Sequence, residues 1–362
     1  MSGGPERDEI RPEPHGPAAG GDFMAGESVQ GDPSPDADAS GGTKGAHASG
    51  GTKGADATGG TKGADASGGT KGGVKADSKA LGHFVRPRIG ILGAHDRPRV
   101  ITALERLRPA ISELADVVVE DLEFKYDFSQ ADLDLLIVLG GDGSILQAAR
   151  QLAGREIPVL GVNCGALGFL AALSVEDFLQ VWPSVCQGGF RIVPHLMLRV
   201  GLLRGGKEIA HQLALNEAAI LGGPPYSLLE IDLYADGSLA TTYRCDGLIV
   251  CTPVGSTAYN LSAGGPILRK HLRAIVIQPI SPHTLTYRPL VDSADTQLEM
   301  IVAKPNQSTS IVVDGRVMGS IRRGDRIRIN ASDHAFRMLT VPGQNEYRTL
   351  REKLGWGGSV LN

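Results

Sequence analysis

The chain has 362 residues, 41% of them hydrophobic, and a net charge of -4, so it can form two domains with globular cores and is not basic enough to favour nucleic-acid binding. No stretch reaches the roughly 18 uninterrupted apolar residues that a membrane helix needs, and the N-terminus has neither the basic start nor the apolar stretch of a secretion signal. We therefore expect no nucleic-acid partner, no membrane partner and a cytoplasmic location. The cysteines show no paired zinc spacing and are predicted to be free thiols in a reducing compartment; they are Cys164, Cys186, Cys245 and Cys251.

Residues 1–82 differ from the rest of the chain in composition. The sequence Gly-Gly-Thr-Lys-Gly recurs every nine residues, beginning at Gly41, Gly50, Gly59 and Gly68. Such a segment has almost no large apolar side chain, so it cannot offset the entropy lost on ordering, and the repeat has no apolar residue to stack as a solenoid would. The composition predicts a disordered tail.

Residues 83–190 alternate short apolar runs with helical patterns. Strands are expected at 88–93, 116–119, 133–139 and 158–162, and helices at 97–114 and 144–152. Strands that are apolar throughout and alternate with helices predict an α/β domain with a parallel, doubly wound sheet. In such sheets ligands bind at the carboxyl ends of the strands.

The strand expected at 133–139 is followed by an aspartate between glycines, Asp142. Residues 135–144 read Leu-Leu-Ile-Val-Leu-Gly-Gly-Asp-Gly-Ser. Glycines let the backbone approach phosphates, and N–H groups at a helix start point at anions. Asp142 puts a negative charge there, which is expected only if it holds a bridging cation or takes a proton from an attacking hydroxyl. The loop is therefore a candidate phosphoryl-transfer site, with a plain strand-to-helix turn as the alternative.

Residues 191–343 change to alternating apolar and polar positions. Clear examples are 196–203, 228–234, 297–302 and 326–330, separated by glycine-containing turn signals. This pattern predicts antiparallel strands in a β-rich domain. Residues 344–362 are predicted to contain a helix at 345–354 that packs back onto the α/β domain.

A second informative stretch lies inside the β-rich region. Gly255 allows a tight turn, Ser256 or Thr257 can cap a helix, and Tyr259 offers a face for stacking a base. Upstream, Asn216-Glu217 places an amide beside a carboxylate, which can hydrogen-bond a ribose diol or an adenine edge. The alternatives are a core tyrosine and a solvated strand end.

Together these motifs resemble the NAD kinase family. The matching elements, in the family's order and spanning about residues 88–356, are Gly140–Ser144, Asn216–Glu217, Asp246–Gly247, Thr252–Pro266, Pro282–Pro289 and Lys353–Trp356. The Gly-Gly-Asp-Gly loop alone is a weak signal, because phosphofructokinase-like and diacylglycerol kinase-like proteins share it. The run from Thr252 to Pro266 is much more specific.

The resemblance implies an enzyme that moves the γ-phosphate of ATP, or of polyphosphate as an alternative donor, onto the adenosine 2'-hydroxyl of NAD to form NADP, with a divalent metal ion such as Mg²⁺. It implies that Asp142 is the proton acceptor for that hydroxyl. It also implies a homodimer or homotetramer whose site is completed near a subunit boundary. The residues implied to contact nucleotide or dinucleotide are Gly141, Gly143, Asn216, Glu217, Arg244, Asp246, Thr257, Ala258, Tyr259, Asn260, Leu261 and Ser262; the sequence assigns no metal ligand.

The chain departs from the family pattern at three positions, where Val254 replaces threonine, Asn260 replaces serine and Arg316 replaces glutamine. Arg316 adds a fixed cation that could aid phosphate binding or shift donor preference, and the sequence does not decide between these. Two other functions stay open: a lipid or sugar kinase that shares the glycine loop, and a non-catalytic dinucleotide sensor. Asp142 favours an enzyme over a sensor, since a pure binder gains nothing from a carboxylate beside phosphate.

Overall fold

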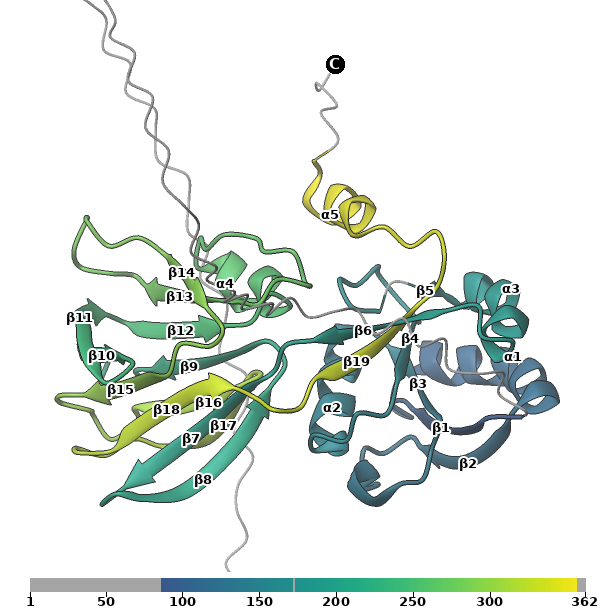
Figure 1. The fold of residues 1–362 in the computed structure, drawn as a ribbon, viewed down its shortest axis with the longest axis horizontal. Coiled ribbons are helices and arrows are strands. Elements are labelled where there is room, and N and C mark those ends of the chain that lie inside the picture. Colours follow the sequence, from purple (N-terminus) through teal and green to yellow (C-terminus); the bar gives the residue numbers. More distant parts are fainter. Residues whose placement is uncertain (1–85, 172, 357–362) are drawn as a thin grey trace, which may run out of the picture. The chain divides into compact units, whose positions relative to one another are not determined.

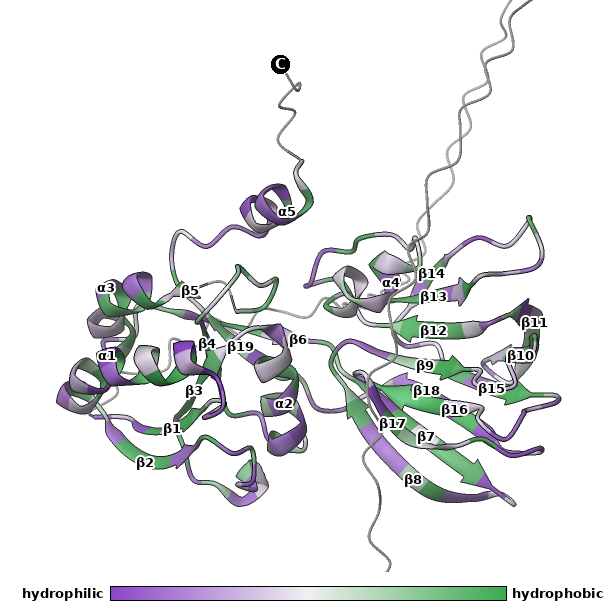
Figure 2. Ribbon diagram, turned by 180° about the vertical axis from the view of Figure 1, so that it is seen from behind, coloured by the Kyte–Doolittle hydropathy of each residue, from purple (hydrophilic) through white to green (hydrophobic). Residues whose placement is uncertain are grey.

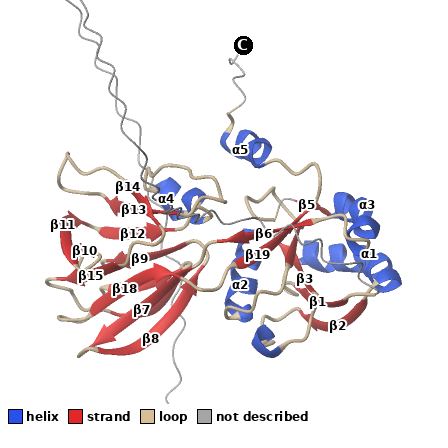
Figure 3. Cartoon of the chain, viewed as in Figure 1, coloured by secondary structure: helices blue, strands red, loops and turns tan. Residues whose placement is uncertain are grey.

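The computed structural model describes residues 86–171 and 173–356, so the tail predicted for residues 1–82 lies outside the described residues. The first part of the described chain is an α/β sheet with helices on both faces (Figures 1 and 3). Its strand order is β2-β1-β3-β4-β19-β6, with β5 paired to β4. The strands are β1 (Arg88–Leu92), β2 (Asp116–Asp121), β3 (Leu135–Gly140), β4 (Val159–Asn163), β5 (Leu173–Ser174), β6 (Arg191–His195) and β19 (Phe336–Thr340).

Continuous apolar sequence places β3 and β4 at the centre of this sheet, where every residue of both strands is buried. Helices α1 (Pro98–Leu114) and α3 (Val175–Cys186) cover one face, and α2 (Asp142–Leu152) covers the other. The pairings are parallel except for β19 with β6. The predicted parallel, doubly wound sheet is confirmed, with one antiparallel edge.

Strands β6 and β19 lie within the range 191–343, which the sequence assigned to the β-rich domain, yet they pair in the first sheet. β19 follows the last strand of the β-rich part and returns to lie between β4 and β6. A local alternation pattern identifies a strand but does not identify its partner, because pairing is decided by contacts distant in sequence.

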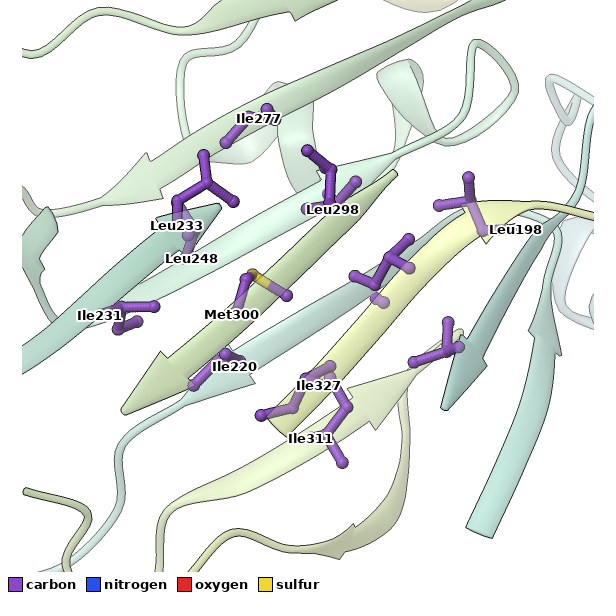
Figure 4. Close-up of a cluster of buried hydrophobic side chains, with 14 of the residues drawn as sticks. Leu198, Ile220, Ile231, Leu233, Leu248, Ile277, Leu298, Met300, Ile311 and Ile327 are labelled. Atoms are coloured by element: carbon purple, nitrogen blue, oxygen red, sulfur yellow. The ribbon is translucent and has the colours of Figure 1, made fainter. Parts of the chain in front are cut away.

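The β-rich part consists of two antiparallel sheets that share one apolar core (Figures 2 and 4). The strand orders are β11-β10-β15-β18-β7-β8 and β14-β13-β12-β9-β16-β17. Burial alternates along strands such as β10 and β18, as the sequence pattern predicted. The strands are β7 (Leu198–Arg204), β8 (Lys207–Ala214), β9 (Glu217–Leu221), β10 (Leu229–Ala235), β11 (Ser238–Cys245), β12 (Gly247–Cys251), β13 (Ala274–Ile280), β14 (Leu290–Ser293), β15 (Leu298–Val302), β16 (Ser310–Val313), β17 (Arg316–Ser320) and β18 (Arg326–Ala331).

The described chain has two further α-helices, α4 (Tyr259–Ser262) and α5 (Glu346–Leu354), and two short 3-10 helices at Phe128–Gln130 and Gly255–Thr257. α5 forms where the sequence predicted a helix, and the Asn345 side chain caps it by accepting the Tyr347 N–H at 2.9 Å. None of its residues is buried, but Glu346 pairs with Arg269 at 3.7 Å and Lys353 lies over the Phe169 ring at 5.0 Å. Among the helices of residues 86–171 and 173–356, none is long and apolar enough to cross a membrane.

Candidate active site

The glycine loop between β3 and α2 leaves open space around its acid. Gly140 has φ +144°, and a Cβ there would lie 2.2 Å from Ser144 Oγ, so only glycine fits. A Cβ at Gly141 or Gly143 would meet no atom within 4 Å, so both positions border unfilled space. α2 begins at Asp142, two residues earlier than expected, and its first turn therefore carries the carboxylate where a helix N-terminus favours negative charge.

Backbone N–H groups from another loop hold the Asp142 carboxylate. Phe169 donates to Oδ2 at 2.8 Å, while Leu170 and Ala171 donate to Oδ1 at 2.8 and 3.1 Å. These donors stabilise the negative charge of the carboxylate at the glycine loop. A carboxylate has roughly four acceptor positions, so a substrate hydroxyl can still donate to Oδ2.

Sequence analysis assigned no site residue to this second loop, which follows β4. Gly168 must lack a side chain, since a Cβ there would lie 2.2 Å from Asp142 Oδ1. The nearby pair of glycines, Gly165 and Gly168, was the signal that could have marked the loop. Sequence analysis also missed Lys270, whose ammonium donates to the Phe169 carbonyl at 2.5 Å.

The Asn216-Glu217 corner is built around the carboxylate of Asp314. Asp314 accepts the backbone N–H groups of Leu215, Asn216 and Glu217 at 2.9, 2.8 and 3.1 Å. Burial raises the pKa of Asp314, although these three hydrogen bonds and the charge of Arg150 oppose the rise. Asp314 therefore fixes the backbone that carries the predicted binding pair.

Glu217 is a buried acid, and one of its carboxyl oxygens has no hydrogen-bond partner among the described residues. Burial and, to a lesser degree, the charge of Asp314 raise the pKa of Glu217 to about 8, while the Tyr259 N–H opposes the rise. The Oε2 atom is buried and has no hydrogen-bond partner among the described residues. Near neutral pH the side chain is mostly a neutral carboxyl that can both donate and accept, and such a group suits a ribose diol.

The turn after β12 lies directly against this corner. The Thr252 N–H donates to the Asn216 carbonyl at 2.8 Å, and Thr252 Oγ1 donates to the Leu215 carbonyl at 2.6 Å. Gly255 approaches so closely that a Cβ would lie 2.1 Å from the Asn216 oxygen. The structure thus brings together two motifs that are about 40 residues apart in the sequence.

The predicted binding segment after that turn differs in exposure from residue to residue. Tyr259 is 39% exposed, which argues against a core position. Thr257, Ala258 and Leu261 are half-buried, and Ser262 is exposed. The side chain of Asn260 is fully buried and donates to the Ser256 and Pro266 carbonyls, both at 3.0 Å, so it holds the turn together.

Apolar side chains join the two halves of the site. Leu215 and Val254 from the β-rich part are buried in the same cluster as Ile145 and Leu170 from the α/β part. Val254 is only 2% exposed, so a threonine hydroxyl at this position would be buried in apolar surroundings. The structure explains why valine is tolerated there.

Two predicted site residues, Arg244 and Asp246, lie away from the Asn216-Glu217 corner. Because β12 pairs with β9 in antiparallel register, with Gly247 opposite Leu221 and Cys251 opposite Glu217, Asp246 lies at the end of β12 away from the corner. At ~3.3 Å per residue the separation from Thr252 is roughly 20 Å. Arg244 is paired with Glu230 at 2.8 Å.

Arg316, whose role the sequence did not decide, contacts helix α2. It donates to Gln147 Oε1 at 3.0 Å, and Arg150 donates to the same oxygen at 2.7 Å. Burial lowers the pKa of Arg150, and the charge of Arg316 lowers it further. Arg316 therefore connects β17 to the helix that begins at Asp142.

The donor set offers little to a metal ion held by protein alone. The part of the chain that the structure describes has no group of three or more His, Cys, Asp or Glu side chains placed to hold one. A hard cation that keeps waters and phosphate oxygens needs only one or two carboxylates. Asp142 fits that role, because it borders the open space at the glycine loop.

Comparisons with known proteins agree with the motif order. Residues 95–190 match a model described as the ATP-NAD kinase N-terminal domain, and residues 215–341 match one described as the ATP-NAD kinase C-terminal domain. The chain is 66% identical over 274 residues to an NAD kinase of Rhodopirellula baltica, covering 76% of this chain and 88% of that protein. It is 38% identical over 233 residues to an NAD kinase of Geotalea daltonii, covering 64% and 82%.

Two solved structures are similar. An NAD kinase from Archaeoglobus fulgidus in complex with ATP has a TM-score of 0.60 and 27% identity, covering 74% of this chain and 98% of that one. Yeast NADH kinase complexed with NADH has a TM-score of 0.66 and covers 76% and 89%. Its identity is 24%, so that likeness concerns the fold alone.

Proposed function

This chain belongs to the NAD kinase family, and we propose that it transfers the γ-phosphate of ATP to the adenosine 2'-hydroxyl of NAD, forming NADP and ADP. The observation that carries the chemistry is a carboxylate, Asp142, held by three backbone N–H groups at the edge of an open glycine loop. In this reaction the 2'-oxygen forms a bond to the γ-phosphorus while the bond to the bridging oxygen of ADP breaks.

Asp142 accepts the proton of the 2'-hydroxyl as that oxygen attacks. A ribose hydroxyl is a poor nucleophile, so orientation and proton removal both lower the barrier. The N–H groups at the glycine loop would bind the phosphates, because phosphoryl transfer depends mainly on positioning and charge neutralisation. Mg²⁺ would neutralise phosphate charge when bound, with Asp142 as a candidate ligand and phosphate oxygens and waters as the others. Polyphosphate is an alternative donor of the same chemistry.

The dinucleotide is proposed to bind at the corner formed by Asn216, Glu217 and the Thr257–Ser262 segment. The neutral carboxyl of Glu217 would bond a ribose hydroxyl, and the exposed ring of Tyr259 would stack on a base. Asp246 lies roughly 20 Å along β12 from Thr252, so we propose that a second copy supplies Arg244 and Asp246 to the ligand in a homodimer or homotetramer. The four free thiols fit a reducing cytoplasm.

The test begins with the wild-type protein, ATP or polyphosphate, Mg²⁺, and NAD or NADH, with NADP or NADPH as the measured product. Asp142→Asn is expected to lower kcat by at least ~100-fold and to leave NAD binding broadly intact, because the amide cannot take the proton. Asp333→Asn, at an exposed aspartate between β18 and β19, is the matched control and should behave as wild type.

This experiment gives a different result for each alternative function, a dinucleotide sensor or a lipid or sugar kinase. Near-normal turnover of the Asp142 variant would remove the base assignment. Binding of NAD without product from any donor would favour a sensor, and phosphorylation of a lipid or sugar in place of NAD would favour the other kinase classes. The family membership and the Thr252–Pro266 run favour the NAD kinase.

A further inference from the structure

Lys270 is connected to Asp142 through a single residue of the loop after β4. Its Nζ donates to the Phe169 carbonyl at 2.5 Å, and the Phe169 N–H donates to Asp142 Oδ2 at 2.8 Å. Lys270 belongs to the segment between α4 and β13, in the β-rich part, whereas Phe169 and Asp142 belong to the α/β part. The contact therefore joins the two halves of the site at the catalytic carboxylate.

The surroundings of Lys270 are charged on several sides. Burial lowers the pKa of Lys270, while Glu346 from α5 and Asp142 from α2 raise it. His195 from β6 packs beside it; burial and the Lys270 charge lower the pKa of His195 to about 4, and its bond to the Lys270 carbonyl opposes the drop, so the imidazole is neutral. Lys353 lies 5.0 Å from the centroid of the Phe169 ring.

Removing an ammonium from water is costly unless it is paired and hydrogen-bonded. Among the described residues, the Lys270 ammonium donates a hydrogen bond to the Phe169 carbonyl, and the N–H groups of Phe169 and Leu170 hold Asp142. The close approach at Gly168, where a Cβ would lie 2.2 Å from Asp142 Oδ1, leaves this loop little room to shift without moving the carboxylate. The position of Phe169 and that of Asp142 are thus linked.

We propose that Lys270 is a positioning residue for phosphoryl transfer, which fixes the Phe169–Ala171 backbone and through it the orientation of the Asp142 carboxylate. The inference rests on the proposed role of Asp142. It assigns to the β-rich part a contribution to proton transfer in addition to dinucleotide binding. Sequence analysis could not find it, because the run Arg269-Lys270-His271 reads as an ordinary solvated basic turn.

The test compares Lys270→Met, which keeps most of the side-chain volume and loses the donor, with Lys270→Arg, which keeps a cationic donor. A misplacement of about 1 Å can cost ~100-fold in rate, so we expect kcat of the methionine variant to fall between ~10- and 100-fold. KM for NAD and for ATP should stay within about twofold, because the binding groups are unchanged. The arginine variant should recover a large part of kcat.

Arg269→Met is the matched control. Arg269 is adjacent in the chain, but its guanidinium lies over the Tyr347 ring at 5.0 Å and near Glu346 instead of touching the Phe169 loop. Its kcat should stay close to wild type. Thermal melting of every variant separates loss of activity from loss of fold, and Lys270→Gln, which retains an uncharged donor, replaces the methionine variant if the latter does not fold.

The decisive measurement is a double-mutant cycle with Asp142→Asn. If Lys270 acts through Asp142, adding Lys270→Met to the Asp142 variant should cost less than about threefold. An equal loss in both backgrounds, or a loss confined to KM for ATP, would overturn the proposal, since either result means that Lys270 acts independently of the carboxylate. Absence of NADP formation by the wild type would instead refute the proposed function itself.

Discussion

Asp142, Asp314 and Glu217 carry the same functional group, but their different surroundings give each carboxyl group a different role. Asp142 and Asp314 each accept three backbone N–H groups, so both are fixed in place. The hydrogen bonds of Asp314 shape the Asn216-Glu217 corner, whereas Asp142 lies between Gly141 and Gly143, which both border unfilled space. Glu217 lacks such donors at Oε2 and is buried, so its proton is retained to a higher pH.

The raised pKa of Glu217 predicts how stability depends on pH. The folded state holds the proton up to about pH 8, whereas the unfolded state loses it near the ordinary value of 4.5. Between these values the folded state binds more protons, so the contribution of Glu217 to the free energy of unfolding falls as pH rises. The side chain of Glu217→Gln does not ionise, so this variant does not lose stability in this way as the pH rises. The Tm of Glu217→Gln minus that of wild type should therefore increase from pH 5 to pH 8.5.

Glu113→Gln serves as the control, because Glu113 is exposed on α1 and its replacement should leave the pH dependence of Tm unchanged. A Tm difference for Glu217→Gln that stays constant over that pH range would mean that Glu217 ionises at its ordinary pKa in the folded protein.

At the scale of elements, the site depends on two loops at the carboxyl ends of neighbouring strands. β3 leads into the glycine loop, and β4, its parallel neighbour, leads into the loop that holds Asp142. Parallel strands place their carboxyl ends at one edge of the sheet, so the two loops meet by topology. The close approach between them requires the absence of a side chain at Gly168.

Gly168→Ala tests this close approach. The added Cβ would lie 2.2 Å from Asp142 Oδ1 and 3.1 Å from the Ala171 carbonyl, so the carboxylate or the loop must move. We expect kcat for NADP formation to fall by ~100-fold, as displacement of a reacting group by about 1 Å does. Gly165→Ala in the same loop is the control, because the nearest atom to its Cβ is Arg99 Nη1 at 3.8 Å. Equal activity of the two variants would show that the loop yields without disturbing Asp142.

At the scale of the whole molecule, the described residues form two folded parts that two chain connections join. β6 leads from the α/β sheet into the β-rich part, and β19 returns from it to pair with β4 and β6. The shared apolar cluster around Val254 and Ile145, together with the Arg316 contact to Gln147, connects the two parts directly. The β-rich part is thus an insertion between two strands of the first sheet.

Deletion of residues 1–80 should leave this arrangement and its activity unchanged. The deleted segment is rich in glycine and small polar residues and offers almost no large apolar side chain to either core. We expect kcat within about twofold of the full chain and a similar Tm, measured by NADP formation and thermal melting. Loss of folding or of activity on deletion would show that the repeat segment contributes to the enzyme.

The sequence by itself determined the fold class, the positions of several strands and helices, and the motifs of the site, because apolar periodicity and glycine spacing are local properties. Asp142, Asn216-Glu217 and the Thr252–Pro266 run were all visible in this way. The sequence did not show that Arg316 would contact α2, or that Asp246 would lie at the far end of β12.

Only the tertiary structure decided which groups act on one another. The three N–H donors to Asp142, the Lys270 contact to Phe169 and the support of the corner by Asp314 each join residues between 27 and 101 positions apart. No periodicity carries information over such separations, since these contacts form when the two parts pack and their backbone groups must find partners. The burial that raises the pKa of Glu217 arises in the same way, from packing and not from local sequence.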